Sequence, residues 1–214
     1  MNDSAKKFGM AWLVVFLLAL AACSIGPSES RAPTTYLLDP QLTLKTPAHP
    51  GWSAAATLLV SPPRSQAGFD TARIAYIRRP HEVSYYAFNQ WADTPARMLM
   101  GLLAQAMERT NLWRAVVQMP SPVRADYRLD SDSLALEQQF FSTPSRVRLA
   151  LRVQLIDLKQ QRIIGTRDLE VFEEAPSDDA YGAVIAANRA TAKLLEQLAA
   201  WVSTTMSANL QNSG

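Results

Sequence analysis

Residues 146–155 have the sequence RVRLALRVQL, in which every second residue is a Val or Leu and Arg or Gln fills all the positions between them except Ala150. A period of two is the spacing of a β-strand that buries one face and leaves the other in water. Residues 158–161 contain a turn signal, and a second apolar run follows at residues 163–172. The two runs therefore predict an antiparallel hairpin, around which the other elements should pack.

Shorter apolar runs upstream of this hairpin predict further strands. The first of them is cut off abruptly by Pro62 and Pro63, as expected of a buried strand with a sharp exit. The next two flank a turn that contains Pro80, so they predict another antiparallel hairpin. These expected strands are residues 57–60, 73–78, 83–88, 113–117 and 127–140.

Capping residues and apolar spacing predict two amphipathic helices. Thr94 followed by Pro95 fits an N-cap with proline at the first helical position. Apolar residues then recur every three or four positions as far as Arg109. Ser177 is the expected N-cap of the second helix, whose apolar stripe continues to Val202 over roughly seven turns.

Half-buried strands and two amphipathic helices together predict an α+β fold in a single domain. The sheet is expected to be largely antiparallel (mixed), with both helices packed on one face. This domain should span residues 53–207, and residues 208–214 are expected to form a disordered tail. A chain of this length buries enough surface for one core of ordinary size.

The beginning of the chain resembles a bacterial lipoprotein signal. Lys6 and Lys7 precede an uncharged run at residues 10–22, which at ~1.5 Å per residue covers about 20 Å and is too short to span a membrane. The run ends at Leu-Ala-Ala-Cys, similar to a lipobox, so residues 1–22 should be cleaved and Cys23 acylated. Ordinary secretion after the Ala-Leu-Ala at residues 19–21 is the alternative, and it would leave a free thiol at Cys23.

Residues 23–52 are expected to form a lipid-anchored, flexible tether. The stretch is rich in proline and small polar residues, a composition that neither buries apolar surface nor sustains a helix. Residues 36–40, Tyr-Leu-Leu-Asp-Pro, are more apolar than their surroundings. They could lie against the domain as a short edge strand that Pro40 ends.

Charge and composition argue against several classes of function. The chain has 21 Lys and Arg against 19 Asp and Glu, and removal of residues 1–22 leaves 19 against 18. Such a near-neutral domain without a basic stripe does not indicate nucleic-acid binding. Cys23 is the only cysteine, so disulfide or thiolate-metal sites are not expected once it is acylated.

The residues also provide no recognisable catalytic site. His49 and His81 are the only histidines, and both fall in predicted loops, so a serine or cysteine nucleophile would lack a base. No glycine-rich phosphate loop is present. Neither the three aspartates between residues 126 and 132 nor the three arginines between 146 and 152 form a recognisable site, since both patterns are typical of a solvated surface. We expect no enzyme activity, cofactor or metal.

The second strand of the Pro80 hairpin is the best candidate for a partner-binding surface. Aromatic side chains and arginine are enriched at binding hot spots, and both residue types gather here. Core packing could explain about half of the aromatic residues, because alternation must bury one side of the strand. The predicted partner-binding residues are Arg78, Arg79, Tyr85, Tyr86, Asn89 and Trp91.

Several segments together resemble the ABC-type transport auxiliary lipoproteins, the PqiC-like family. These are the lipobox, residues 36–40, Arg-Arg-Pro at 78–80, Tyr-Tyr-Ala-Phe-Asn-Gln-Trp-Ala-Asp-Thr-Pro at 85–95, residues 125–129 and residues 186–190. The resemblance implies an outer-membrane lipoprotein that serves a transport system with MCE (mammalian cell entry) domains. Such systems move lipids or other apolar molecules between the two membranes. It implies no catalytic residues.

The expected function is therefore that of an accessory lipoprotein. It would be anchored in the outer membrane through acyl chains on Cys23, with its domain in the periplasm, and would dock on an MCE-domain partner. Ser24 is compatible with export to the outer membrane, where an Asp would favour retention in the inner one. A periplasmic lipid-binding lipoprotein acting alone and an envelope hydrolase are the alternatives. A homo-oligomer is left open.

Overall fold

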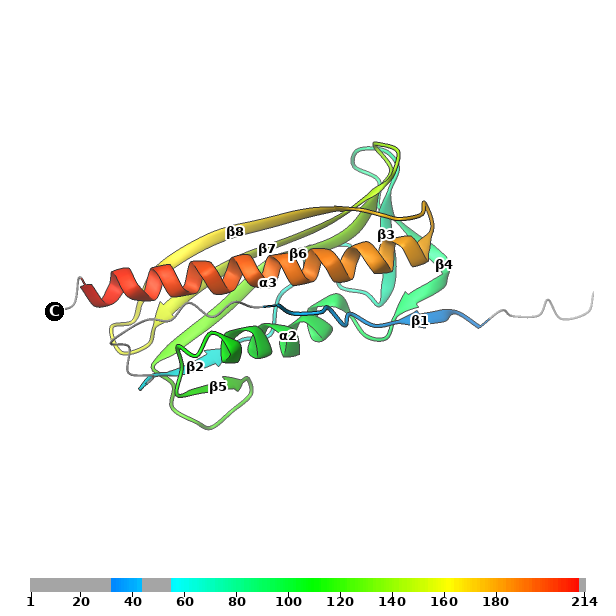
Figure 1. The fold of residues 1–214 in the computed structure, drawn as a ribbon. Coiled ribbons are helices and arrows are strands. Elements are labelled where there is room, and N and C mark those ends of the chain that lie inside the picture. Colours follow the sequence, from blue (N-terminus) through cyan, green and yellow to red (C-terminus); the bar gives the residue numbers. More distant parts are fainter. Residues whose placement is uncertain (1–31, 44–54, 212–214) are drawn as a thin grey trace, which may run out of the picture. The chain divides into compact units, whose positions relative to one another are not determined.

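The computed structural model describes residues 32–43 and 55–211 (Figure 1). They form a mixed eight-stranded sheet and two helices, which confirms the predicted α+β class. The strands are β1 (Thr34–Tyr36), β2 (Thr57–Val60), β3 (Arg73–Ile77), β4 (Ser84–Trp91), β5 (Ala115–Gln118), β6 (Tyr127–Gln139), β7 (Arg146–Asp157) and β8 (Arg162–Glu174). The helices are α2 (Pro95–Arg109) and α3 (Ala180–Gln211).

The strand order is β1-β4-β3-β6-β2-β5, with β7 on β6 and β8 beyond β7. Both predicted hairpins are confirmed, because β3 pairs antiparallel with β4 and β7 pairs antiparallel with β8. The long strand β6 also lies antiparallel to β7. It pairs parallel with β2 near Tyr127 and parallel with β3 near Gln139.

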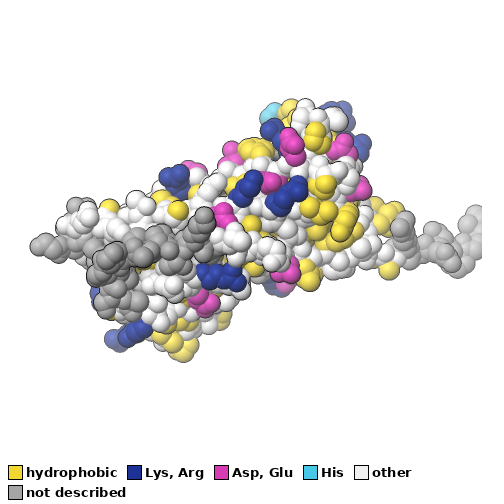
Figure 2. All heavy atoms as spheres, viewed as in Figure 1, with side chains coloured by type: hydrophobic (Ala, Val, Ile, Leu, Met, Phe, Trp, Pro, Cys, Tyr) yellow, Lys and Arg dark blue, Asp and Glu magenta, His cyan; other side chains and the backbone are white. Residues whose placement is uncertain are grey.

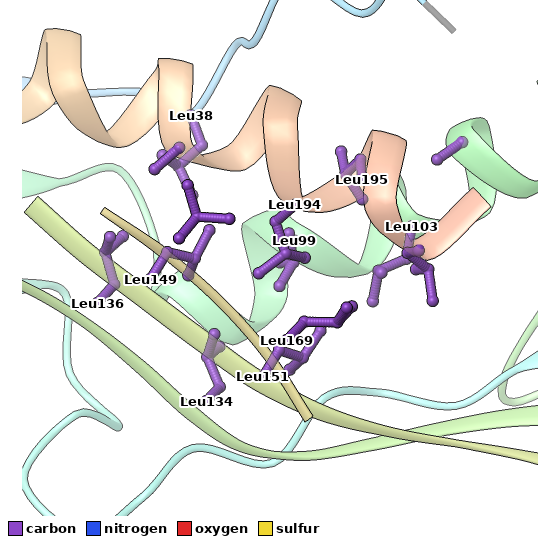
Figure 3. Close-up of a cluster of buried hydrophobic side chains, with 14 of the residues drawn as sticks. Leu38, Leu99, Leu103, Leu134, Leu136, Leu149, Leu151, Leu169, Leu194 and Leu195 are labelled. Atoms are coloured by element: carbon purple, nitrogen blue, oxygen red, sulfur yellow. The ribbon is translucent and has the colours of Figure 1, made fainter. Parts of the chain in front are cut away.

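Strand β7 has the alternation that its sequence predicts. Every second residue from Val147 to Leu155 is buried, and Arg146 and Arg152 on the other face are exposed. The buried positions face the two helices across a leucine-rich core. Figure 3 shows leucines of both helices directed towards leucines of the sheet. Both helices therefore cover the same face of the sheet, as predicted.

Helix α2 begins and ends where its sequence predicts. Thr94 is the N-cap, and its hydroxyl accepts a hydrogen bond from the Arg97 N–H at 3.4 Å. Pro95 occupies the first turn, where its missing N–H costs nothing. Thr110 caps the other end, and Asn111 follows with a φ of 54°, a conformation that asparagine adopts more readily than most residues.

Helix α3 begins later than predicted, because Asp179 and not Ser177 is its N-cap. The Asp179 carboxylate accepts from the Gly182 N–H at 2.7 Å, and its carbonyl accepts from the Ala183 N–H at 3.0 Å. Ser177 instead donates to Asp179 at 2.8 Å. A Cβ on Gly182 would lie 2.1 Å from the Ser177 carbonyl oxygen, so only glycine fits here. The helix also continues to Gln211, past the predicted domain end at residue 207.

Residues 34–42 of the predicted tether lie on the domain. Strand β1 pairs parallel with β4 as an edge strand, but it covers Thr34–Tyr36, so only Tyr36 of the stretch predicted at residues 36–40 is part of it and Pro40 does not end it. Leu38 is buried in the core. The Asn188 side chain of α3 accepts from the Asp39 N–H at 2.6 Å and donates to the Leu37 carbonyl at 3.4 Å. One amide thus binds the extended backbone in the way that a neighbouring strand would.

The strand predicted at residues 113–117 is displaced in the structure to Ala115–Gln118. Trp113 lies before it in the connection from α2, where it is buried and its ring centroid is 5.7 Å from that of Tyr127. Trp113 is therefore apolar because it packs in the core beneath the end of α2, and not because it belongs to a strand.

Candidate partner-binding surface

One part of the predicted surface forms a compact cluster at the ends of β3 and β6. Arg78 is exposed, and its guanidinium lies 5.3 Å from the Tyr76 ring centroid and 5.4 Å from that of Phe140. The Tyr76 ring also contacts Phe140 edge-on at 6.0 Å and Tyr86 at 4.9 Å. We call these four residues, Tyr76, Arg78, Tyr86 and Phe140, the Arg78 cluster.

Pairing between distant strands positions this cluster. Tyr76 lies opposite Gln138 in the parallel β3–β6 ladder, and the Phe140 N–H donates to the Ile77 carbonyl at 2.9 Å. The β3–β4 turn and the β6–β7 turn consequently lie side by side at the top of Figure 1. Each aromatic side chain is half-buried, so the rings hold the arginine on a fixed apolar base.

Hydrogen bonds fix Tyr86 within the Arg78 cluster. Its hydroxyl donates to the Gln138 side-chain oxygen at 2.6 Å, and the Gln138 amide donates to the Ser145 hydroxyl at 2.8 Å. Burial, with a further contribution from the negative charge of Asp179, raises the pKa of Tyr86 to about 12. The phenol is therefore neutral at any physiological pH and serves as a hydrogen-bond donor.

Arg78 and Arg79 differ in how far their charges are already satisfied. Arg79 forms an ion pair with Glu82 at 3.1 Å across the β3–β4 turn. In the part of the chain that the structure describes, no carboxylate pairs with Arg78. Its planar guanidinium lies on aromatic rings with its N–H donors available to a ligand, which is the arrangement typical of an arginine hot spot.

Tyr85 and Asn89 make their contacts outside the Arg78 cluster. The Tyr85 hydroxyl donates to the Gly68 carbonyl at 2.7 Å, and the Arg73 guanidinium lies 4.5 Å from its ring centroid. Asn89 accepts from the Tyr36 hydroxyl at 3.2 Å, which ties β4 to β1. These two residues therefore stabilise neighbouring segments and do not join the Arg78 cluster.

Trp91 was predicted to bind a partner, and this assignment is wrong. Its side chain is only 2% exposed and lies among Ile74, Leu136, Ala183 and Ala187. A register irregularity between β3 and β4 alters the alternation along β4, so a simple period of two could not place this residue. Trp91 is part of the core.

Sequence reasoning missed Tyr76 and Phe140 as members of the surface. Both were assigned to strands, with no indication that they meet, since their contact depends on the pairing of β3 with β6 some sixty residues later. Phe141 and Val83 add exposed apolar surface in the two turns, with 52% and 37% of their area accessible. Aromatic residues at strand ends were the only available signal.

The face of β7 opposite the helices is a ladder of ion pairs. Arg148 lies 2.6 Å from Glu170 and 3.1 Å from Glu137, and Arg152 lies 3.4 Å from Asp168. Burial raises the pKa of the Glu137 carboxyl, against the opposing effect of Arg148. Arg148 and Arg152 are thus paired with carboxylates within the sheet, and Arg146 lies over the Phe172 ring with its guanidinium carbon 5.1 Å from the ring centroid.

The aspartates between residues 126 and 132 are also paired within the domain. Asp126 accepts from the Thr57 N–H at 2.8 Å and lies 2.9 Å from Lys159, and these contacts lower the pKa of its carboxyl. Asp130 pairs with Arg128 at 2.9 Å. Within residues 32–43 and 55–211, no group of three His, Cys, Asp or Glu side chains could hold a metal ion.

The core contains little space beside Trp91. A cavity there has a volume of about 10 Å³, room for about one water molecule. Two surface hollows of about 260 and 250 Å³ are lined largely by polar groups such as Arg148 and Asp168 in one and Arg128 and Asp130 in the other. Sites for apolar ligands are typically about 300–1,000 Å³ and lined by hydrophobic side chains, which these hollows do not resemble.

The fold is that of a small α+β domain with an exposed arginine and aromatic surface, and comparison with known proteins gives its family. The chain matches the family described as "ABC-type transport auxiliary lipoprotein component" over residues 36–199, and it belongs to that family. The resemblance inferred from the sequence is confirmed. The description of the family is that of a transport auxiliary. No curated protein sequence matches the chain.

Many solved structures match the chain, and two crystal structures among them illustrate the similarity in fold. A protein from Xanthomonas campestris gives a TM-score of 0.73 at 24% sequence identity, covering 83% of this chain and 99% of the other. An uncharacterized protein gives a TM-score of 0.62 at 14% identity, with coverages of 80% and 99%. At these identities the comparison supports the fold alone.

Cys23, the predicted lipid attachment site, lies outside the described residues. His49 also falls outside them, whereas His81 is exposed in the β3–β4 turn. Neither α2 nor α3, the helices of the described part, is both long and apolar enough to cross a membrane.

Proposed function

We propose that this protein is an accessory lipoprotein of an MCE-type ABC transport system, which moves lipids or other apolar molecules between the inner and outer membranes. It is anchored in the outer membrane through acyl chains on Cys23, with its domain in the periplasm. The domain acts by docking on the MCE-domain partner and not by catalysis. The observation that carries the proposal is the family match over residues 36–199.

The Arg78 cluster is the surface that best fits the docking role. An arginine that lies on a base of aromatic rings and pairs with no carboxylate of the described residues can give a partner both charge-assisted hydrogen bonds and apolar contact. The base is held by the Tyr86–Gln138–Ser145 hydrogen bonds, so little side-chain freedom is lost on binding. Among the described residues, the cavity beside Trp91 and the two polar surface hollows do not resemble a site that would carry lipid inside the domain.

Replacement of Arg78 tests this role against a neighbour of similar exposure. Arg78→Ala should weaken binding to the MCE-domain partner by about thirtyfold, which corresponds to ~2 kcal/mol, since it removes a candidate hot spot. Arg79→Ala should change binding by less than about threefold, because Arg79 is paired with Glu82 and exposed pairs contribute little. Co-purification from detergent-solubilised envelopes and titration of the recovered partner provide the measurement.

Both variants should melt close to the parent, because both arginines are exposed. Equal binding by Arg78→Ala and the parent would remove the Arg78 cluster from the interface. Recovery of no MCE-domain protein by the parent itself would contradict the proposed function.

A further inference from the structure

Large apolar side chains are exposed around β1, on the part of the domain where the chain from Cys23 enters. Leu37 is 63% exposed, Tyr181 58% and Phe88 51%. Tyr181, in the first turn of α3, lies 6.2 Å from Tyr36 of β1, measured between ring centroids. Phe88 directly precedes Asn89, which pairs with Thr34. Figure 2 shows hydrophobic side chains gathered where β1 lies beside the start of α3.

From these positions we infer that Leu37, Phe88 and Tyr181 form a membrane-contacting surface that rests on the lipid headgroup region of the membrane carrying the anchor. This inference relies on the proposed function, because it needs acyl chains on Cys23. Beyond that function, the inference specifies which side of the domain faces the membrane and which residues contact the lipid.

The length of chain between the anchor and β1 is the first argument. Eleven peptide steps join Cys23 to Thr34, and at about 3.3–3.6 Å each even a fully extended chain spans no more than roughly 40 Å. Strand β1 and the surface around it are therefore held near the bilayer whatever path the chain takes. Tethering raises the effective concentration of this surface at the bilayer. A contact with lipid that would be weak for an untethered domain is therefore favoured.

Attachment of the segment after β1 is the second argument. Leu38 is buried, Asn188 binds the backbone on both sides of it, and the Leu42 carbonyl accepts from Arg109 at 2.8 Å. The chain is thus fixed to the domain from Thr34 to Leu42, so these residues do not lengthen the connection between the anchor and the domain. Exposed apolar residues elsewhere, such as Val123 in the β5–β6 loop, do not lie beside β1, through which the domain connects to the anchor.

The chemistry of the three side chains is the third argument. Tyrosine is enriched at membrane–water interfaces because its ring enters the apolar region while its hydroxyl remains hydrated. Leucine and phenylalanine contribute apolar area whose removal from water is favourable. The surface therefore fits a headgroup boundary better than a spanning or fully buried position.

A fluorescent probe on single cysteines tests the inference. Acylation leaves no free thiol in the parent, so Tyr181→Cys and Leu37→Cys each create one site for an environment-sensitive dye. Val123→Cys is the matched control, because Val123 is apolar and 51% exposed. The full-length acylated proteins are placed in vesicles of phosphatidylethanolamine and phosphatidylglycerol that contain a spin-labelled quencher lipid.

Dyes at positions 181 and 37 should shift to shorter wavelength and show severalfold stronger quenching than the dye at 123. Equal quenching at all three positions, or none at 181 and 37 in protein that floats with the vesicles, would overturn the inference and leave the proposed anchor intact. Shielding at 181 that appears only when a partner protein is added would also overturn it. Protein that neither carries acyl chains nor floats would refute the anchor and the inference together.

Discussion

Replacing Trp91 by alanine is expected to destabilise the domain by about 3–5 kcal/mol, the usual cost of truncating a large buried aromatic side chain. Trp91 is 2% exposed and lies among Ile74, Leu136 and two alanines of α3, so its truncation would enlarge the cavity in the core. For a domain of this size, where each kcal/mol shifts the melting temperature by about 2–4 °C, the midpoint should fall by roughly 10 °C. Thermal unfolding followed by circular dichroism provides the measurement.

Phe88→Ala on the same strand is the control for this prediction. Phe88 is 51% exposed, so its removal should alter the free energy of unfolding by less than about 1 kcal/mol. If Trp91→Ala melted with the parent, Trp91 would not be the core residue that we describe, and its original interpretation as a surface residue would regain support.

Loss of Cys23 is expected to have the largest effect on location. Cys23→Ala removes the only thiol in the chain, so no acyl chains can be attached there. Each buried methylene contributes ~0.8 kcal/mol and two chains are enough for stable anchoring, so the variant should leave the membrane fraction. Intact mass spectrometry and fractionation of the envelope provide the measurement.

The same mass measurement on the parent separates lipidation from ordinary secretion. Acylated protein should begin at Cys23 and carry the mass of its acyl chains. A mature parent protein that begins at Cys23 or Ala22 with no added acyl mass would rule out the anchor. Cys23→Ser should behave as Cys23→Ala does, since a hydroxyl does not replace the thiol.

The sequence predicted most of the fold because local signals and tertiary packing agree in this chain. Residues 146–155 alternate except at Ala150, and in β7 every second residue from Val147 to Leu155 is buried. Thr94 and Pro95 start α2 as expected from capping alone. Agreement of this kind between local preference and final structure is typical of natural domains.

The predictions that differ from the structure concern the N-cap of α3, the strand at Trp113 and the burial of Trp91. In each case the local sequence allows two interpretations and a tertiary contact decides between them. Ser177 and Asp179 are both good N-caps, and the choice of Asp179 depends on a contact between Gly182 and the Ser177 backbone that a linear sequence does not reveal. Trp113 was placed in a strand because its apolar character does not distinguish strand pairing from packing. Trp91 was misplaced because the register irregularity in β4 shifts the faces of the strand.

The candidate site could be predicted only in part, since it is built from segments far apart in the chain. Arg78 and Tyr86 were identified from one hairpin. Tyr76 and Phe140 become part of the same surface through the parallel pairing of β3 with β6, which sequence patterns do not specify. Which arginine keeps a free charge also depends on structure, because Glu82 pairs with Arg79 and leaves Arg78 unpaired by a carboxylate among the described residues.

The central claim is that an MCE-domain protein docks at the Arg78 cluster, and site-specific photo-crosslinking in intact cells tests it most directly. A photoreactive amino acid is placed at Phe141, in the turn beside the cluster, or at Ile163, at the start of β8. Both side chains are 52% exposed, so a photoreactive group is equally accessible to a bound protein at either position. We expect a crosslink to an MCE-domain protein from position 141 and none from position 163. No such crosslink from position 141, or equal crosslinking from both positions, would contradict the claim.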